Sequence, residues 1–129
     1  MFELPTPRLR LIALDIENLR LSLYNRPQME KNLGLEASQG MLEGELREAV
    51  EQMLCGAVRD EAGYLWHTHW QVVLQSQRRI IGGLCFKGPP NDRGEVEVGY
   101  GIIAEYEGRG YMSEALTANG VDDECLHAV

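Results

Sequence analysis

Apolar and polar residues alternate along several segments of the chain, which predicts strands. The run 8–12 (Arg-Leu-Arg-Leu-Ile) has a two-residue period, and Pro7 directly before it suits the start of a strand. Three later segments share apolar, aromatic and β-branched residues and are predicted as strands: 64–74, 80–86 and 95–103. Turn-forming residues separate these strands at 75–79 and 88–94.

Apolar residues at helical spacing predict two helices between the first and second of these strands. Asp15 is expected to cap the first helix, whose apolar residues recur from Ile16, and Pro27 is expected to end it because proline lacks an N–H. The second helix is predicted over 42–58, with one apolar face. A third helix is predicted after Gly110, and four of its residues are expected to pack: Tyr111, Ala115, Leu116 and Ala118.

The order of these elements predicts the fold class. One strand, two helices, three strands joined by short turns and a final helix indicate an α/β fold of the α+β type. We expect a mixed, mainly antiparallel sheet flanked by helices. The length of 129 residues suits a single domain over 1–129.

Charge and composition limit the classes of partner. The formal net charge of −8 would repel phosphates, so nucleic acid is not expected as a partner. No apolar run approaches the roughly 20 residues that cross a bilayer. The N-terminal segment does not resemble a signal peptide, because Glu3 precedes any basic residue and Pro5 and Pro7 interrupt the apolar stretch. We therefore expect a cytoplasmic protein without a membrane partner.

The cysteines and histidines do not form the spacing of a metal site. The three cysteines are widely spaced and odd in number, which is untypical of a disulfide framework: Cys55, Cys85 and Cys125. His67 and His69 lie two apart on a predicted strand and would share a face, but no third ligand is evident. We therefore expect no metal.

The segment 105–116 (EYEGRGYMSEAL) has the strongest local signal for binding. A strand is predicted to end near Ile103, and Gly108-Arg109-Gly110 follows directly before a helix. The first amides of a helix lack intrahelical partners and carry partial positive charge, and glycines let a bulky anion approach them. The segment therefore predicts either a phosphate or pyrophosphate site, to which Arg109 could add a contact, or a plain tight turn. Both interpretations stay open on these grounds.

Two segments together resemble the acyl-CoA motif of the GNAT superfamily of N-acetyltransferases: 97–102 (EVGYGI) and 105–116. The most similar branch is the one that includes the ribosomal-protein alanine acetyltransferases. Segment 6–11 (TPRLRL) resembles the first strand of that branch, and segments 80–84 and 86–88 resemble its third. The resemblance runs from about residue 4 to about residue 118 and implies a GNAT-like acyl-CoA N-acyltransferase fold.

The resemblance also implies acetyl-CoA as co-substrate and direct acetyl transfer to a primary amine of a small molecule or peptide. The pantetheine would run along Ile102 and Ile103. The pyrophosphate would meet the backbone amides of five consecutive residues: Gly108, Arg109, Gly110, Tyr111 and Met112. A carboxylate on the fourth strand would deprotonate the amine, because an ammonium cannot attack a thioester. Glu97 is the candidate by position and Glu95 is the second, and strand parity puts both on one face.

The chain departs from the family pattern after Leu116, where nothing matches the fifth strand and the helix that follows it in the family. We therefore expect a GNAT-like fold that lacks its C-terminal strands. The edge of the fourth strand would then expose unpaired backbone groups, so we expect a homodimer or the segment 117–129 to cover it. Three functions stay open: an active N-acetyltransferase, a non-catalytic acyl-CoA-binding module, and an oligomerising module without a ligand.

Overall fold

The computed structural model describes residues 1–38 and 44–120 and contains one five-stranded sheet. Its strands lie side by side in chain order: β1 (Glu3–Pro5), β2 (Leu9–Ala13), β3 (His69–Leu74), β4 (Arg79–Phe86) and β5 (Val98–Ile102). Each neighbouring pair of strands is antiparallel. The predicted α/β fold with a mainly antiparallel sheet flanked by helices is confirmed.

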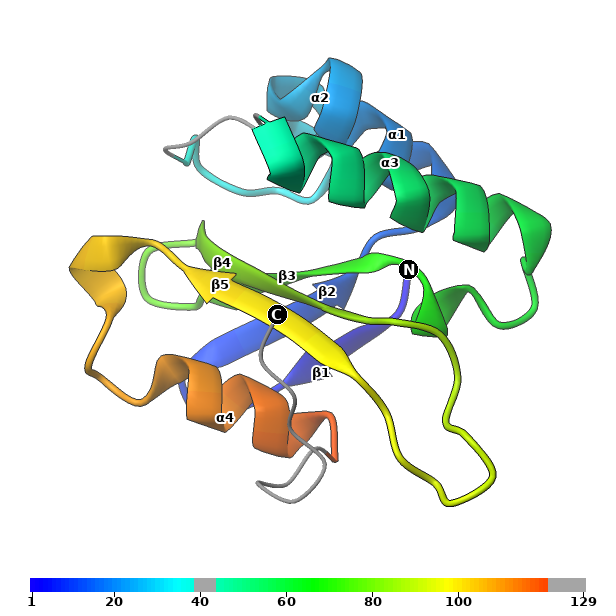
Figure 1. The fold of residues 1–129 in the computed structure, drawn as a ribbon. Helices are drawn as coiled ribbons and strands as arrows, with labels where there is room; N and C mark the ends of the chain where they lie inside the picture. The colour runs from blue at the N-terminus through cyan, green and yellow to red at the C-terminus, as the bar shows by residue number, and fades with distance from the viewer. Residues whose placement is uncertain (39–43, 121–129) are drawn as a thin grey trace.

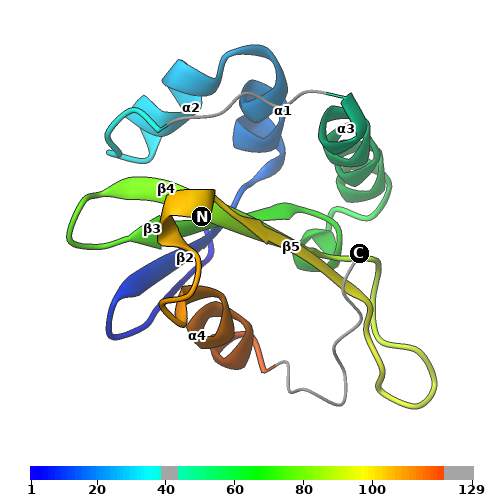
Figure 2. The ribbon, with the colours of Figure 1, turned by 60° about the vertical axis from the view of Figure 1, so that its left-hand side comes forward.

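Helices cover both faces of the sheet, as Figures 1 and 2 show. Three helices lie over one face: α1 (Ile16–Tyr24), α2 (Arg26–Asn32) and α3 (Gly44–Arg59). Helix α4 (Tyr111–Ala118) lies against the opposite face. Short 3-10 helices occur at η1 (Tyr64–Trp66) and η2 (Ala104–Tyr106). We call the two sides of the sheet the α4 face and the α1–α3 face.

Each face buries an apolar cluster, because alternate strand residues point to opposite sides of a sheet. The cluster on the α4 face contains Leu9, Leu11, Ala13, Trp70, Val72, Leu74, Ile81, Leu84, Phe86, Val98, Tyr106, Ala115 and Leu116. The cluster on the α1–α3 face contains Ile12, Leu14, Leu19, Leu23, Met29, Val50, Ala57, Val73 and Ile80. In the described sheet, β5 is the edge strand opposite to β1.

Asn25 separates α1 from α2, and the prediction that Pro27 ends the first helix is wrong. Asp15 caps α1 as predicted, its side chain accepting a hydrogen bond from a backbone amide one turn later. Helix α1 ends at Tyr24, and the side chain of Asn25 accepts from the amide of Gln28 to start α2. Pro27 lies in the first turn of α2, where a missing N–H costs no intrahelical hydrogen bond.

Two predicted strands are shorter than the sequence pattern indicates. The segment 64–74 begins with η1, and the strand starts only at His69. His67 therefore does not share a strand face with His69 and instead lies beside Asp60, with Nε2 3.1 Å from Oδ2. The segment 95–103 is a strand only from Val98 to Ile102. Single backbone hydrogen bonds extend the β4–β5 pairing beyond these bounds, from the Lys87 amide to the oxygen of Glu97 at 2.9 Å and from the Ile103 amide to the oxygen of Ile81 at 2.8 Å.

The ends of the sheet and of α4 also differ from the predictions. The pattern does not predict β1, because three residues are too few to show a period, and Pro5 is tolerated there since β1 is an edge strand. Ala118, predicted to pack, is exposed. The predicted start of the second helix at 42–43 and the segment 121–129 lie outside the described residues.

Candidate functional site

The connection between β5 and α4 ends in a left-handed glycine loop. Gly108 and Gly110 have φ values of +76° and +79°, a region that glycine adopts without strain. Gly110 is the N-cap of α4, and it has no side chain that could cap the helix. A Cβ added at Gly108 would meet no atom within 4 Å. The first amides of α4, including those of Tyr111 and Met112, therefore remain open to an external acceptor.

Arg8 holds this loop in place from the other end of the chain. Its guanidinium donates to the backbone oxygen of Arg109 at 3.0 Å and lies 4.4 Å from the centre of the Tyr111 ring. It also pairs with Glu114 on α4, with Nε 2.8 Å from Oε1. The backbone amide of Arg8 donates to Glu114 Oε2 at 3.0 Å, and the Thr6 hydroxyl donates to the same oxygen at 2.5 Å.

This network keeps Glu114 ionised. Partial burial alone would raise the pKa of its carboxyl group, but the hydrogen bonds from Thr6 and from Arg8, with the charge of Arg8, outweigh it and hold the pKa below its usual value. We call Thr6, Arg8 and Glu114 the loop clamp. Sequence reasoning missed the clamp, because Arg8 and Glu114 are 106 positions apart and each reads locally as an ordinary surface charge.

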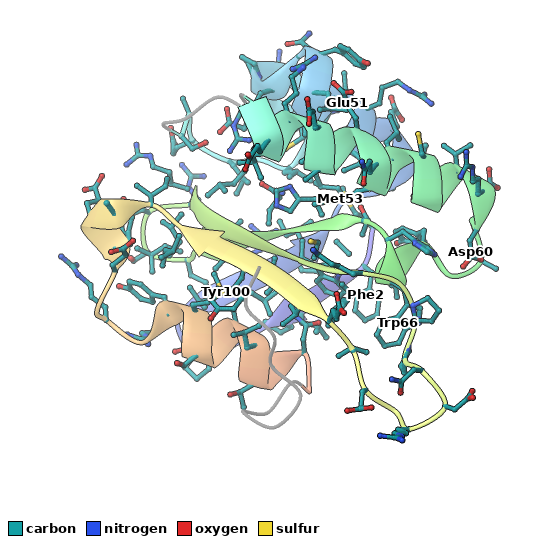
Figure 3. All side chains as sticks on the ribbon, viewed as in Figure 1. Phe2, Glu51, Met53, Asp60, Trp66 and Tyr100 are labelled. Atoms are coloured by element: carbon teal, nitrogen blue, oxygen red, sulfur yellow. The ribbon has the colours of Figure 1, made fainter. Side chains whose placement is uncertain are left out.

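The residues of β5 alternate between the two faces of the sheet. Val98 is buried in the α4-face cluster, and the half-buried Ile102 and Ile103 pack against the same cluster. Tyr100 also lies on the α4 side and is 37% exposed (Figure 3). Gly99 and Gly101 therefore face α1–α3, where they pair with Cys85 and Gly83 of β4.

The two candidate bases precede β5 and are both exposed. The backbone oxygen of Glu97 accepts from the amide of Lys87 at 2.9 Å, which extends the β4–β5 pairing by one bond. Because Val96 packs against the α4-face cluster, Glu97 faces the α1–α3 side with Gly99. The side chain of Glu95 accepts from Asn91 Nδ2 at 3.2 Å, so it is tied to the loop before β5.

Other candidate chemistry is limited within residues 1–38 and 44–120. Burial raises the pKa of the Cys85 thiol, more than Gly99 and Lys87 lower it, so this cysteine stays protonated. These residues contain no group of three or more histidine, cysteine or acidic side chains that could hold a metal ion. None of the helices in this part of the chain is both long and apolar enough to cross a membrane.

Comparison with known proteins identifies the family. Residues 8–121 match the acetyltransferase (GNAT) domain family. The chain belongs to the GNAT acetyltransferases. The resemblance noted in the sequence is thereby confirmed, and so is the fold that it implies.

The relatives include N-acetyltransferases of bacteria. The uncharacterized N-acetyltransferase YjdG of Bacillus subtilis (strain 168) is 30% identical over 115 residues, which is 89% of this chain and 68% of that protein. An acetyltransferase of Salmonella typhimurium that modifies the N-terminal serine of ribosomal protein L7/L12 has a TM-score of 0.56 at 18% identity. The ribosomal-protein-S5-alanine acetyltransferase of Vibrio fischeri also has a TM-score of 0.56, at 17% identity. Each structure is matched over 92% of this chain and 65% of its own, so the chain spans about two thirds of their length.

Proposed function

We propose that the chain binds acetyl-CoA at the glycine loop and transfers its acetyl group to a primary amine. The observation that carries this proposal is the uncapped start of α4 behind two left-handed glycines. Backbone amides at such a position bind phosphate oxygens whatever the net charge of the chain. Family membership supports the same ligand, and one structural neighbour, RimL, is described in complex with coenzyme A.

The residues at the loop fit a pyrophosphate in space and in charge. The space beside Gly108 is open, and the half-exposed guanidinium of Arg8 lies beside the first turn of α4. Arg109 is exposed on the loop and could add a second cation. Ile102 and Ile103 would then contact the pantetheine. When bound, acetyl-CoA would supply the activated acetyl group.

Glu97 would take a proton from the acceptor ammonium, directly or through a water molecule, so that the nitrogen can attack. Its side chain is exposed and has no hydrogen-bond partner among the described residues, whereas the carboxylate of Glu95 is held by Asn91. This difference favours Glu97 over Glu95 as the general base. A base with no internal partner can approach a substrate without first breaking a hydrogen bond.

A binding test separates this function from a module without a ligand. Acetyl-CoA titrated calorimetrically into the chain should bind with a Kd near the micromolar range, about −8 kcal/mol at 1 μM. Gly108→Glu should abolish binding, because it places a carboxylate where the pyrophosphate would lie. Gly94→Glu is the matched control, since Gly94 has the same φ of +76° and open surroundings. Absence of binding to the unmodified chain would refute the proposal.

A turnover test separates an enzyme from a non-catalytic acyl-CoA-binding module. Release of CoA thiol should depend on added amine and should fall about 10²-fold or more in Glu97→Gln. Glu95→Gln should retain most of the rate. Binding of acetyl-CoA without amine-dependent release of thiol would instead favour the non-catalytic module.

The open side of β5 supports a homodimer as a further part of the proposal. Among residues 1–38 and 44–120, no strand pairs with the side of β5 that faces away from β4. A symmetric strand–strand contact would satisfy those backbone groups. Sedimentation at decreasing concentration would test it, and a monomer at all concentrations would exclude this dimer.

The free thiols of Cys55 and Cys85 suit the cytoplasm, where we place the protein.

A further inference from the structure

The turn between β3 and β4 lies at the same end of the sheet as the glycine loop. Because the strands are antiparallel and lie in chain order, the start of β2, the β3–β4 turn and the end of β5 point toward one end of the sheet. Figure 1 shows the β3–β4 turn beside η2 at this end. The turn consists of residues 75–78, and the reaction proposed above does not use it. We call it the hairpin turn.

Gln77 of the hairpin turn holds the segment that leads from β5 into the glycine loop. The hydroxyl of Tyr106 donates to Gln77 Oε1 at 2.7 Å. Tyr106 lies in η2, directly before the glycine loop, and is only 7% exposed. The centre of its ring also lies 6.5 Å from that of Tyr111, the first residue of α4. One buried side chain therefore links the hairpin turn to both ends of the glycine loop.

Gln75 of the hairpin turn holds the segment that carries the loop clamp. Its side-chain nitrogen donates to the backbone oxygens of Thr6 and Leu9, each at 2.7 Å. Its backbone amide donates to the backbone oxygen of Arg8 at 2.9 Å. Three hydrogen bonds from one residue thus fix the segment from which the Arg8 guanidinium reaches the glycine loop.

The segment that follows α2 holds the hairpin turn from the other side. The backbone amide of Glu36 donates to the backbone oxygen of Arg78, and the Arg78 guanidinium donates to Glu36 Oε1, each at 2.8 Å. Next to the turn, Arg79 Nε donates to the backbone oxygen of Ala37 at 2.9 Å. Arg78 has a φ of +50°, a left-handed conformation that a non-glycine residue keeps only where its surroundings hold it. The hairpin turn is therefore held in one conformation.

We propose that Gln75 and Gln77 are positioning residues for acetyl-CoA, which hold the glycine loop in the conformation that presents its amides to the pyrophosphate. Each acts through another residue, Gln77 through Tyr106 and Gln75 through the segment that bears Arg8. A loop that is already ordered binds its ligand more tightly, because binding then costs less conformational entropy. This inference rests on the proposed function, since it takes the glycine loop as the acetyl-CoA site.

Two substitutions at one hydrogen bond test the role of Gln77. Gln77→Met removes the acceptor and Tyr106→Phe removes the donor, and each should weaken the calorimetric binding of acetyl-CoA about three- to tenfold. Because both remove the same hydrogen bond, the double variant should bind no more weakly than either single variant. An unchanged affinity in both single variants, or losses that multiply in the double variant, would overturn the inference.

Gln75→Met tests the second positioning residue and should weaken acetyl-CoA binding at least about threefold, because it releases the segment that bears the loop clamp. Gln28→Met and Tyr24→Phe are matched controls on the helices of the α1–α3 face and should leave the affinity unchanged. Gln28 donates to Asn32 Oδ1 at 2.8 Å, and Tyr24 is 68% exposed. An unchanged affinity in Gln75→Met would show that this side chain serves only the sheet, and equal losses in the controls would overturn the inference.

A measurement without ligand separates this inference from the proposed function. NMR order parameters of the Gly108 and Gly110 amides should be about 0.85 in the unmodified chain and should fall toward about 0.6 in Gln77→Met and Tyr106→Phe, while those of β3 stay unchanged. A purely structural role would lower the unfolding free energy without loosening the glycine loop. Absence of acetyl-CoA binding in the unmodified chain would refute the proposed function, even where the loop loosens in the variants. Unchanged order parameters in both variants would overturn the positioning role, even where acetyl-CoA binds.

Discussion

The same strands carry different kinds of side chain on the two faces of the sheet. On the α4 face, consecutive inward residues of β3 and β4 are large and apolar, such as Trp70, Val72 and Leu84, and they fill the space under α4. On the α1–α3 face, the same stretch carries His69, Gln71 and glycines, and buried nitrogens lack partners among the described residues. Both faces bury an apolar cluster, but on the α1–α3 face this stretch of the strands also holds buried nitrogens without a partner among the described residues. Natural proteins accept such local costs mainly at functional sites.

The largest expected effect comes from removing apolar volume on the α4 face. Leu84 is 1% exposed, and Leu84→Ala should reduce the free energy of unfolding by about 2–5 kcal/mol through lost burial and a residual cavity. Cys85→Ala changes the next residue, which is half-buried on the other face, and should cost less than about 1 kcal/mol. Denaturant unfolding of both variants measures the difference. Equal losses of unfolding free energy in the two variants would contradict the conclusion that Leu84 on the α4 face contributes more to stability than Cys85 on the other face.

Acidification should weaken the α1–α3 face before it weakens the α4 face. The folded pKa of His69 is about 4, and the unfolded value is about 6.5. Between these values the unfolded chain binds a proton that the folded chain does not, so stability is complete above pH 6.5 and falls as the pH drops to 4. The full loss amounts to about 3 kcal/mol. His69→Gln should flatten the stability curve in this window, and an identical pH dependence in both proteins would argue against a neutral imidazole in the folded chain.

Two glycines at the β4–β5 pairing should respond differently to the same small addition. A Cβ on Gly82 would lie 2.5 Å from the backbone oxygen of Gly101, so Gly82→Ala should push the strands apart and cost about 1–3 kcal/mol. A Cβ on Gly101 meets open space, and Gly101→Ala should change stability by less than about 0.5 kcal/mol. Thermal unfolding of both variants measures the difference, and equal losses of stability would contradict the open space beside Gly101.

The sequence predicts the parts of the molecule that depend on local patterns. The alternation over 8–12, the cap at Asp15 and the glycines at 108 and 110 each act through neighbouring residues, and the structure contains the corresponding strand, helix start and left-handed loop. The strand boundaries are less well predicted. The aromatic residues of η1 look like strand residues, but their packing against β4, as in the contact of Trp66 with Phe86, does not require strand geometry.

The parts that the sequence does not predict join residues far apart in the chain. His69 reads as one of two histidines on a strand, and Gln71 as an ordinary strand residue. Arg26 lies 43 positions before His69, and only the folded chain brings its charge close enough to lower the pKa of the imidazole. The loop clamp has the same origin, since β2 must lie beside α4 before Arg8 can reach the glycine loop. Such contacts follow from the tertiary fold and leave no periodic signal.

The loop clamp should have the smallest effect on stability and a selective effect on binding. The side chains of Arg8 and Glu114 are 43% and 19% exposed, and ion pairs of this kind contribute about 0–1 kcal/mol. Glu114→Gln should therefore leave the unfolding free energy almost unchanged, while freeing Arg8 from its position beside the first turn of α4. We expect the affinity for acetyl-CoA to fall by about three- to tenfold, since one hydrogen-bonding cation is no longer oriented.

Glu3→Gln supplies the comparison that makes this small effect interpretable. Glu3 pairs with Arg10 at 2.5 Å between β1 and β2, with side chains 36% and 35% exposed. Glu3→Gln therefore removes a similar surface ion pair that lies away from the glycine loop. The two variants should lose similar amounts of stability, but only Glu114→Gln should weaken acetyl-CoA binding measured by calorimetry. If both weaken it equally, the effect belongs to the net charge of the chain. If neither variant weakens acetyl-CoA binding, the backbone alone keeps the glycine loop in its conformation, and the contacts of Arg8 serve the fold rather than the ligand.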